Sequence, residues 1–183
     1  MKKLALILSL ATGCGLAAQA QAAATGTVTF NGLLTANTCD VTVDGQAADA
    51  TITLPTVGIA QLSAPTNTAG ETGFVMALEN CTGGTLTTAS AFFEAGPSVD
   101  LTTGRLKNTS SGGATNVSLQ LLDGSSASRS VINVGNTDQT TDTAYVSISS
   151  GSAVLPYSVR YYAEGTTTPG VVTSNVVYSI KYQ

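Results

Sequence analysis

The stretch LPYSVRYY, residues 155–162, decides the fold class of this chain. Leucine, tyrosine, valine and tyrosine fill its odd-numbered positions, and proline, serine, arginine and tyrosine fill the even-numbered ones. Successive side chains of an extended chain point to opposite faces, so a period of two predicts a half-buried β-strand. The same alternation recurs in residues 74–79, 117–122 and 176–183, which predicts further strands of the same kind.

Turn-forming dipeptides separate the alternating stretches. Examples are Asp44-Gly45, Gly83-Gly84, Gly112-Gly113, Asp123-Gly124 and Pro169-Gly170, which supply the positive or fixed φ angles that chain reversals need. No helical pattern runs longer than a turn or two, and 183 residues suit one ordinary domain. The sequence therefore predicts a single all-β domain, either a sandwich or a barrel.

The composition excludes several classes of function. Histidine is absent, and a Ser/His/Asp relay or a Cys/His zinc site needs an imidazole. The formal net charge of −4 argues against a nucleic-acid partner, because phosphates are bound by clustered Lys and Arg. Acidic residues alone can serve a glycosidase, but here they are scattered along the chain. We expect no enzymatic activity and no cofactor.

The N-terminal residues have the features of an export signal. Lys2 and Lys3 precede an apolar run, and the alanine-rich stretch 18–24 offers small-x-small cleavage sites. We expect residues 1–22 to be a signal peptide, with cleavage after Ala20 or Ala24 as the alternatives to Ala22. A lipoprotein signal ending at Cys14 is a further alternative, although Ala11 stands where such signals usually have leucine.

Removal of the signal peptide leaves two cysteines, Cys39 and Cys81. A secreted protein passes through an oxidising compartment in which a bridge persists. Closing a loop of about 40 residues stabilises the fold by roughly 4 kcal/mol in the chain-entropy account. The sequence therefore predicts one disulfide, with two buried free thiols as the alternative.

Both ends of the mature chain show strand-like alternation. Near the N-terminus small and apolar residues share one parity and Thr or Asn fills the other; the first set is Ala24, Gly26, Val28, Phe30 and Gly32. Near the C-terminus the alternating apolar positions are Val176, Tyr178, Ile180 and Tyr182. Periodicity alone favours an ordinary first strand that folds into the chain's own sandwich, and it leaves open a strand that pairs elsewhere.

Several motifs occur together in a specific order. They are GTVTFNG at 26–32, FxMxLxNC at 74–81, TNVSLQLLD at 115–123, YYA at 161–163, TPG at 168–170 and YxIxYQ at 178–183. In order, spacing and placement at the two termini, this set resembles the major subunits of type 1 fimbriae, which are chaperone–usher pilins. The resemblance covers essentially the whole mature chain.

The resemblance implies an immunoglobulin-like β-sandwich that lacks its last strand and is completed by a donor strand from a neighbouring subunit. It implies a donor-strand extension at 23–32, carrying the five residues of the N-terminal parity set, and a pilin domain at 33–183. It also implies that the terminal strand lines the groove and is recognised by a chaperone. The residues concerned are Gly170, Val176, Tyr178, Ile180 and Tyr182.

The function that the resemblance implies is structural. Subunits would polymerise head to tail by donor-strand exchange into a shaft that supports adhesion. The expected partners are identical subunits, a periplasmic chaperone, an outer-membrane usher and tip or adaptor pilins. The expected route leads through the periplasm to a fimbrium on the cell surface. The alternatives are a secreted carbohydrate-binding or adhesive β-sandwich module, or a minor adaptor subunit.

Overall fold

The computed structural model describes residues 26–125 and 129–183. The predicted signal peptide and Ala24 lie outside the described residues. Residues 34–183 form one compact unit. Its strands are β1 (Thr38–Val43), β2 (Thr68–Thr82), β3 (Thr88–Phe93), β4 (Val99–Asp100), β5 (Arg105–Lys107), β6 (Val117–Asp123), β7 (Val146–Ser147), β8 (Ala153–Ala163) and β9 (Tyr178–Tyr182), joined by a 3₁₀ turn η1 (Ile59–Leu62) and a one-turn helix α1 (Gln139–Asp142).

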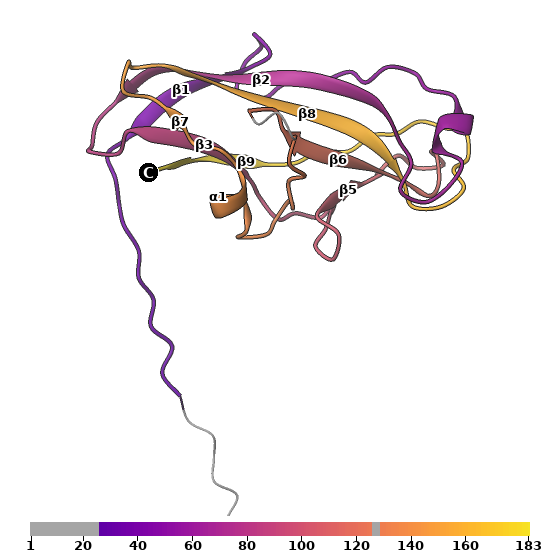
Figure 1. Ribbon diagram of the computed structural model, residues 1–183, viewed down its shortest axis with the longest axis horizontal. Coiled ribbons are helices and arrows are strands. Elements are labelled where there is room, and N and C mark those ends of the chain that lie inside the picture. Colours follow the sequence, from indigo (N-terminus) through magenta and orange to yellow (C-terminus); the bar gives the residue numbers. More distant parts are fainter. Residues whose placement is uncertain (1–25, 126–128) are drawn as a thin grey trace, which may run out of the picture. The chain divides into compact units, whose positions relative to one another are not determined.

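The strands form two facing sheets (Figure 1). Within the described residues, one sheet has the order β1-β2-β8-β6-β5-β4 and the other has the order β7-β3-β9, and every pairing is antiparallel. The long strands β2 and β8 make the centre of the larger sheet, because their alternating apolar residues pair in register from Phe74↔Tyr157 to Leu78↔Ala153. The predicted all-β sandwich is confirmed.

The core lies between the sheets, and Tyr157 joins them. Its ring lies 5.8 Å from that of Phe74 on the neighbouring strand and 5.2 Å, edge-on, from that of Phe93 on the opposite sheet. Its hydroxyl oxygen accepts a hydrogen bond of 3.0 Å from the backbone N–H of Ala91. A buried tyrosine hydroxyl needs such a partner. The ring contact with Phe93 and the hydrogen bond from Ala91 together position β3 over β8.

The alternating stretches of the sequence coincide with strands. Residues 74–79 lie in β2, 117–122 in β6 and 155–162 in β8, and the last stretch contains β9. In β2 and β8 the apolar parity faces the core, as the period of two predicts. β6 differs from the predicted half-buried strand, because Ser118, Gln120 and Leu122 on the other parity are buried as well. No helix among the described residues is long and apolar enough to cross a membrane.

Candidate functional site

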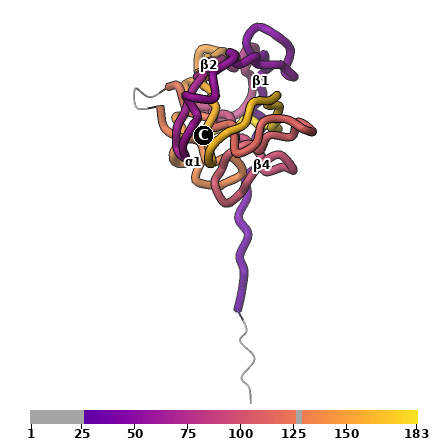
Figure 2. The backbone as a smooth tube through the Cα atoms, turned by 90° about the vertical axis from the view of Figure 1, so that its right-hand side faces the viewer, coloured from indigo at the N-terminus to yellow at the C-terminus, as the bar shows by residue number. Residues whose placement is uncertain are grey.

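The sandwich is open along one side. β1 is an edge strand of the larger sheet, and β9 is an edge strand of the smaller one. Figure 2 shows the yellow C-terminal segment running beside β1, and residues of both strands line one hollow. No backbone hydrogen bond joins residues 39–57 to residues 172–180. Two unpaired strand edges therefore face each other across a gap, which is where a further strand can pair.

A chain of hollows runs along this gap. A hollow of about 690 Å³ lies between residues 39–41 and 176–180. The next, of about 490 Å³, lies between residues 48–54 and 173–178, and the third, of about 410 Å³, lies between residues 56–59 and 167–172. Along this series the residue numbers rise on one wall and fall on the other, so the walls run antiparallel. We call this series of hollows the groove.

The middle of the groove opens onto the hydrophobic core. Its lining includes side chains from both sheets, among them Phe74, Met76, Phe93 and Leu121. Both walls contribute half-buried apolar residues. In the wall that runs from residue 39 to residue 59, which we call the first wall, they include Ile52, Leu54 and Val57. In the C-terminal wall, which begins near residue 167 and which we call the terminal wall, they are Val172, Val176, Tyr178, Ile180 and Tyr182. A groove with this lining favours an apolar occupant.

Backbone hydrogen bonds hold the terminal wall along one edge. The carbonyl oxygens of Val171 and Thr173 accept hydrogen bonds from the N–H groups of Ala114 (3.0 Å) and Thr109 (2.8 Å). The carbonyl oxygen of Val177 accepts a hydrogen bond from the N–H of Glu94 (2.8 Å). From Tyr178 onward the wall is strand β9, which pairs with β3. Loop 108–114 and β3 thus satisfy one edge of this wall, while its other edge faces the groove.

Ser174 is a polar residue at an inward position of the groove. Its Oγ is buried and has no hydrogen-bond partner among the described residues. An unpaired buried hydroxyl costs about 1–3 kcal/mol.

The two tyrosines of β9 lie half-buried in the wall. The Tyr178 hydroxyl donates a hydrogen bond to the carbonyl oxygen of Ala48 on the opposite wall. Burial raises the pKa of Tyr178, and the nearby carboxylate of Asp49 adds to this. Burial also raises the pKa of Tyr182, and this effect outweighs a hydrogen bond from the backbone of Cys39, which lowers it. Both phenols therefore stay neutral and act as hydrogen-bonding groups.

Gly170 stands at the beginning of the terminal wall, in the lining of the 410 Å³ hollow. A Cβ added there would lie 2.7 Å from the carbonyl carbon of Gly113 and 3.0 Å from Cα of Ala114. Because these are backbone atoms, they cannot move aside without displacing loop 108–114. The close approach of two backbone segments thus gives a local reason for glycine at this position.

The predicted donor residues lie in a stretch without secondary structure. Residues 26–37 form no strand or helix. Val28 is 75% exposed and Phe30 is 90% exposed, while Gly26 and Gly32 have no neighbouring atom that an added Cβ would touch. We call residues 26–34 the leading segment.

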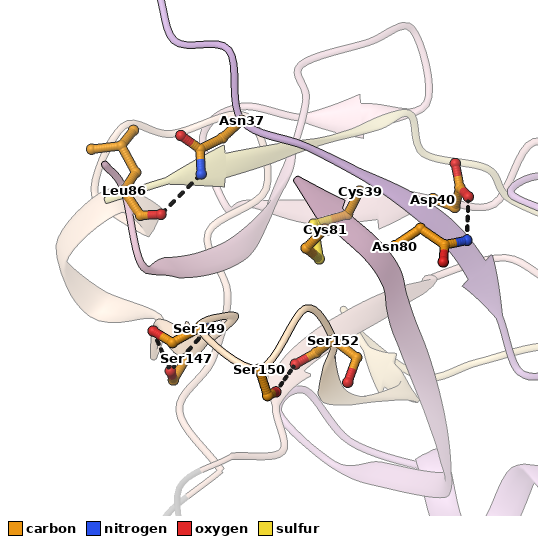
Figure 3. Close-up of a disulfide and its surroundings, with 10 residues drawn as sticks. All are labelled: Asn37, Cys39, Asp40, Asn80, Cys81, Leu86, Ser147, Ser149, Ser150 and Ser152. Atoms are coloured by element: carbon orange, nitrogen blue, oxygen red, sulfur yellow. Dashed lines mark hydrogen bonds between the residues drawn. A yellow bond between two sulfur atoms is a disulfide. The ribbon is translucent and has the colours of Figure 1, made fainter. Parts of the chain in front are cut away.

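The predicted disulfide is confirmed. Cys39 of β1 is bonded to Cys81 of β2 (Figure 3). Nearby, Asn80 Nδ2 donates a 2.8 Å hydrogen bond to the Asp40 carboxylate, so the same two strands are also joined by their side chains. Cys39 lines the 690 Å³ hollow, and the bridge therefore fixes one end of the groove.

Two parts of the site were absent from the sequence-based prediction. The first is the wall at residues 48–59, where the alternation Ile52-Thr53-Leu54 is a signal that could have revealed it. The second is the pair Leu33 and Leu34, which are 79% and 100% exposed. Leu34 continues the parity of Val28 and Phe30, so the apolar face of the leading segment extends beyond residue 32.

The terminal wall with its alternating apolar residues lies within the part of the chain that matches a known family. The family model for type-1 fimbrial protein, A (FimA), matches residues 54–183. This range includes the last residues of the first wall and the whole terminal wall. The chain belongs to this family.

Individual relatives extend the match over the whole fimbrial subunit. This chain is 37% identical to the F17 fimbrial protein of Escherichia coli over 190 residues, and the alignment covers 100% of both chains. It is 41% identical to the major fimbrial subunit SMF-1 of Stenotrophomonas maltophilia (strain K279a) over 162 residues, covering 87% of this chain and 94% of the relative.

A solved structure shows the same fold. A subunit of a chaperone–usher pilus aligns with a TM-score of 0.60 at 20% identity, covering 88% of this chain and 98% of the other. Together with the family match, this identifies the protein as a structural subunit of a surface fimbrium that polymerises into a filament. The family is non-enzymatic, and a carbohydrate-binding module is not favoured.

Proposed function

We propose that this fimbrial subunit assembles by donor-strand exchange, in which the leading segment of one subunit fills the groove of the next. The single observation that carries the proposal is the groove between β1 and β9, whose facing edges lack a paired strand. The exposed apolar residues of the leading segment are its complement in chemistry. In this proposal the donor strand is residues 23–32, carrying Ala24, Gly26, Val28, Phe30 and Gly32, and the acceptor domain is residues 33–183.

Two energetic terms favour insertion at every joint. The incoming strand satisfies the N–H and C=O groups of the open edges, and burial of Val28 and Phe30 contributes roughly 1.5–3 kcal/mol each. Donor and acceptor are different surfaces of one chain, so the contact is head to tail and need not close into a ring. This is the symmetry that a filament requires.

We further propose the route by which the groove stays covered before assembly. Residues 1–22 direct the chain to the periplasm, where a chaperone lends a strand to the groove and recognises the terminal strand with Gly170, Val176, Tyr178, Ile180 and Tyr182. An outer-membrane usher then exchanges that strand for the next subunit's leading segment. The half-buried apolar side chains of the terminal wall support this role, because they are incompletely covered in the lone chain.

We propose the main shaft as the place of this subunit, and a minor adaptor position as the alternative. Electron microscopy of sheared surface filaments, with mass spectrometry of their subunits, tests both. The shaft position predicts this chain as the most abundant subunit, with a mature N-terminus near residue 23. Filaments in which this chain is rare would overturn the shaft position and leave the adaptor role.

The donor-strand step has its own test. A chain that lacks residues 23–32 is expected to accept a synthetic peptide of residues 24–34 and to form no filament by itself. Durable, monomeric folding of the shortened chain, with no peptide uptake, would contradict an open groove. Deletion of residues 178–183 is expected to abolish co-purification with the chaperone, and unchanged co-purification would contradict recognition of the terminal strand.

A further inference from the structure

The chain between the leading segment and β1 is fastened to the domain. Asn37 Nδ2 donates a 2.9 Å hydrogen bond to the carbonyl oxygen of Leu86, which lies 49 positions later in the sequence (Figure 3). Thr35 Oγ1 donates to Asn37 Oδ1 at 2.7 Å and accepts from the Asn37 N–H at 3.1 Å. These two bonds orient the Asn37 amide, so its NH₂ group is directed at the turn before β3.

The turn that receives Asn37 contains two glycines with left-handed backbone. Gly83 has φ +86° and Gly84 has φ +52°. An added Cβ on Gly83 would lie 2.7 Å from the carbonyl carbon of Ala36, and one on Gly84 would lie 2.8 Å from Asn37 Cγ. Glycine is therefore required both by the φ angles and by the close approach of residues 36–37.

The disulfide joins the same two stretches of chain as this contact. Cys39 follows Asn37 by two residues, and Cys81 precedes Gly83 by two residues. A covalent bond and a side-chain hydrogen bond thus hold the same two stretches of chain together. We call Thr35, Asn37, Gly83, Gly84 and Leu86 the exit clasp. Thr35 is exposed and Asn37 is only half-buried, so these residues add little to the core.

We propose that the exit clasp is a positioning device that limits rotation between successive subunits of the filament. The inference rests on the proposed function, in which the donor strand of each subunit, residues 23–32, is held in a neighbour's groove. The stretch that joins this segment to its own domain then determines how freely the two subunits swivel. Because the clasp holds the chain from Thr35 onward, free rotation is confined to Leu33 and Leu34.

Filament stiffness tests the proposal. Filaments are sheared from cells whose only copy of this subunit is unchanged or carries Asn37→Ala, Asn37→Asp or Asn136→Ala, and their persistence length is measured by electron microscopy. Asn37→Asp keeps the acceptor for Thr35 and loses the donor to Leu86. Asn136→Ala is the matched control, because it removes one local side-chain bond in an exposed loop far along the chain.

Loss of the hydrogen bond from Asn37 to Leu86 is expected to raise the population of subunits in which residues 35–37 have detached from the domain about fivefold. Both Asn37 variants should therefore form filaments with a shorter persistence length than the unchanged protein, while Asn136→Ala filaments keep the unchanged value. Equal stiffness in all filaments would overturn the proposal, as would loss of filaments from a folded Asn37→Ala subunit. Absence of filaments in the unchanged cells would instead contradict the proposed function.

Discussion

The hydroxyl group of Tyr178 donates a 2.8 Å hydrogen bond to the carbonyl oxygen of Ala48, from one wall of the groove to the other. Both residues line the 490 Å³ hollow and also the 690 Å³ hollow, so the bond lies where the two meet. A strand that enters along the whole groove is therefore expected to break it. The lone chain is thus held in a partly closed form.

Replacing Tyr178 by phenylalanine is expected to speed uptake of a donor peptide. The bond contributes about 1 kcal/mol, so its loss should raise the association rate of a labelled peptide of residues 24–34 about fivefold. Fluorescence anisotropy with a refolded chain lacking residues 1–32 gives this rate. Tyr162→Phe is the control, because Tyr162 lies against Arg105 on the outer face of β8. Equal rates for both variants would show that the bond does not restrict entry.

Phe30→Asp is expected to abolish filaments while the subunit remains folded and bound to the chaperone. The substitution would place a carboxylate in the apolar groove, which costs several kcal/mol when the charge has no partner. Electron microscopy measures filaments, and affinity purification of the chaperone measures the bound subunit. Thr29→Asp, on the opposite parity, serves as the control and should leave filaments in place. Normal filaments from Phe30→Asp cells would exclude Phe30 as a donor residue.

Gly170→Ala is expected to destabilise the domain by about 1–3 kcal/mol. The added methyl group would press on the backbone of Gly113 and Ala114 and displace the terminal wall. Gly165→Ala is a matched control, because its Cβ would meet nothing closer than 3.6 Å. Denaturant unfolding of both variants measures the difference. Similar unfolding midpoints for the two would contradict the packing argument for Gly170.

Reduction of the Cys39–Cys81 bridge is expected to lower the free energy of unfolding by roughly 4 kcal/mol, because the bond closes a loop with a sequence separation of 42. Denaturant titrations with and without reductant measure this loss. The mature protein, unfolded in the presence of a thiol-blocking reagent, should show no free thiol. Labelling of two thiols per chain would contradict the bridge in the exported protein.

Stability is expected to fall in acid through Glu164. Burial alone would raise its pKa, but hydrogen bonds from Arg105 and Ser118 and the Arg105 charge outweigh this, and the net pKa lies below the ordinary value of 4.5. A carboxyl group with a lowered pKa stabilises the fold above pH 4.5, and this contribution disappears as the pH falls through its folded-state pKa.

Glu164→Gln tests this pH dependence. The variant should unfold more easily than the unchanged protein at pH 7, and the difference should shrink as the pH falls below 4.5 and the carboxyl group becomes protonated. Thermal melts over this pH range measure it. The Glu164 side chain is 38% exposed, so added salt should also reduce the difference. A difference that stays constant with pH would contradict the assignment.

Much of the fold was accessible from local patterns. The period of two in residues 74–79, 117–122 and 155–162 predicts strands because it encodes which side of an extended chain is buried. The cysteine pair followed from counting within a secreted chain. The donor role of Val28 and Phe30 came from the family resemblance and stays a prediction, since periodicity alone favours an ordinary first strand.

The sequence by itself determined the β class, the positions of its main strands and the disulfide partners, because alternation and cysteine number are properties of short stretches or of simple composition. Only the tertiary structure decided that β1 and β9 face each other unpaired, that residues 48–59 form part of the first wall of the groove, and that Asn37 is fastened to Leu86. These features depend on which distant strands pair and which edges remain open. Pairing of this kind is a property of the whole chain, and no local pattern records it.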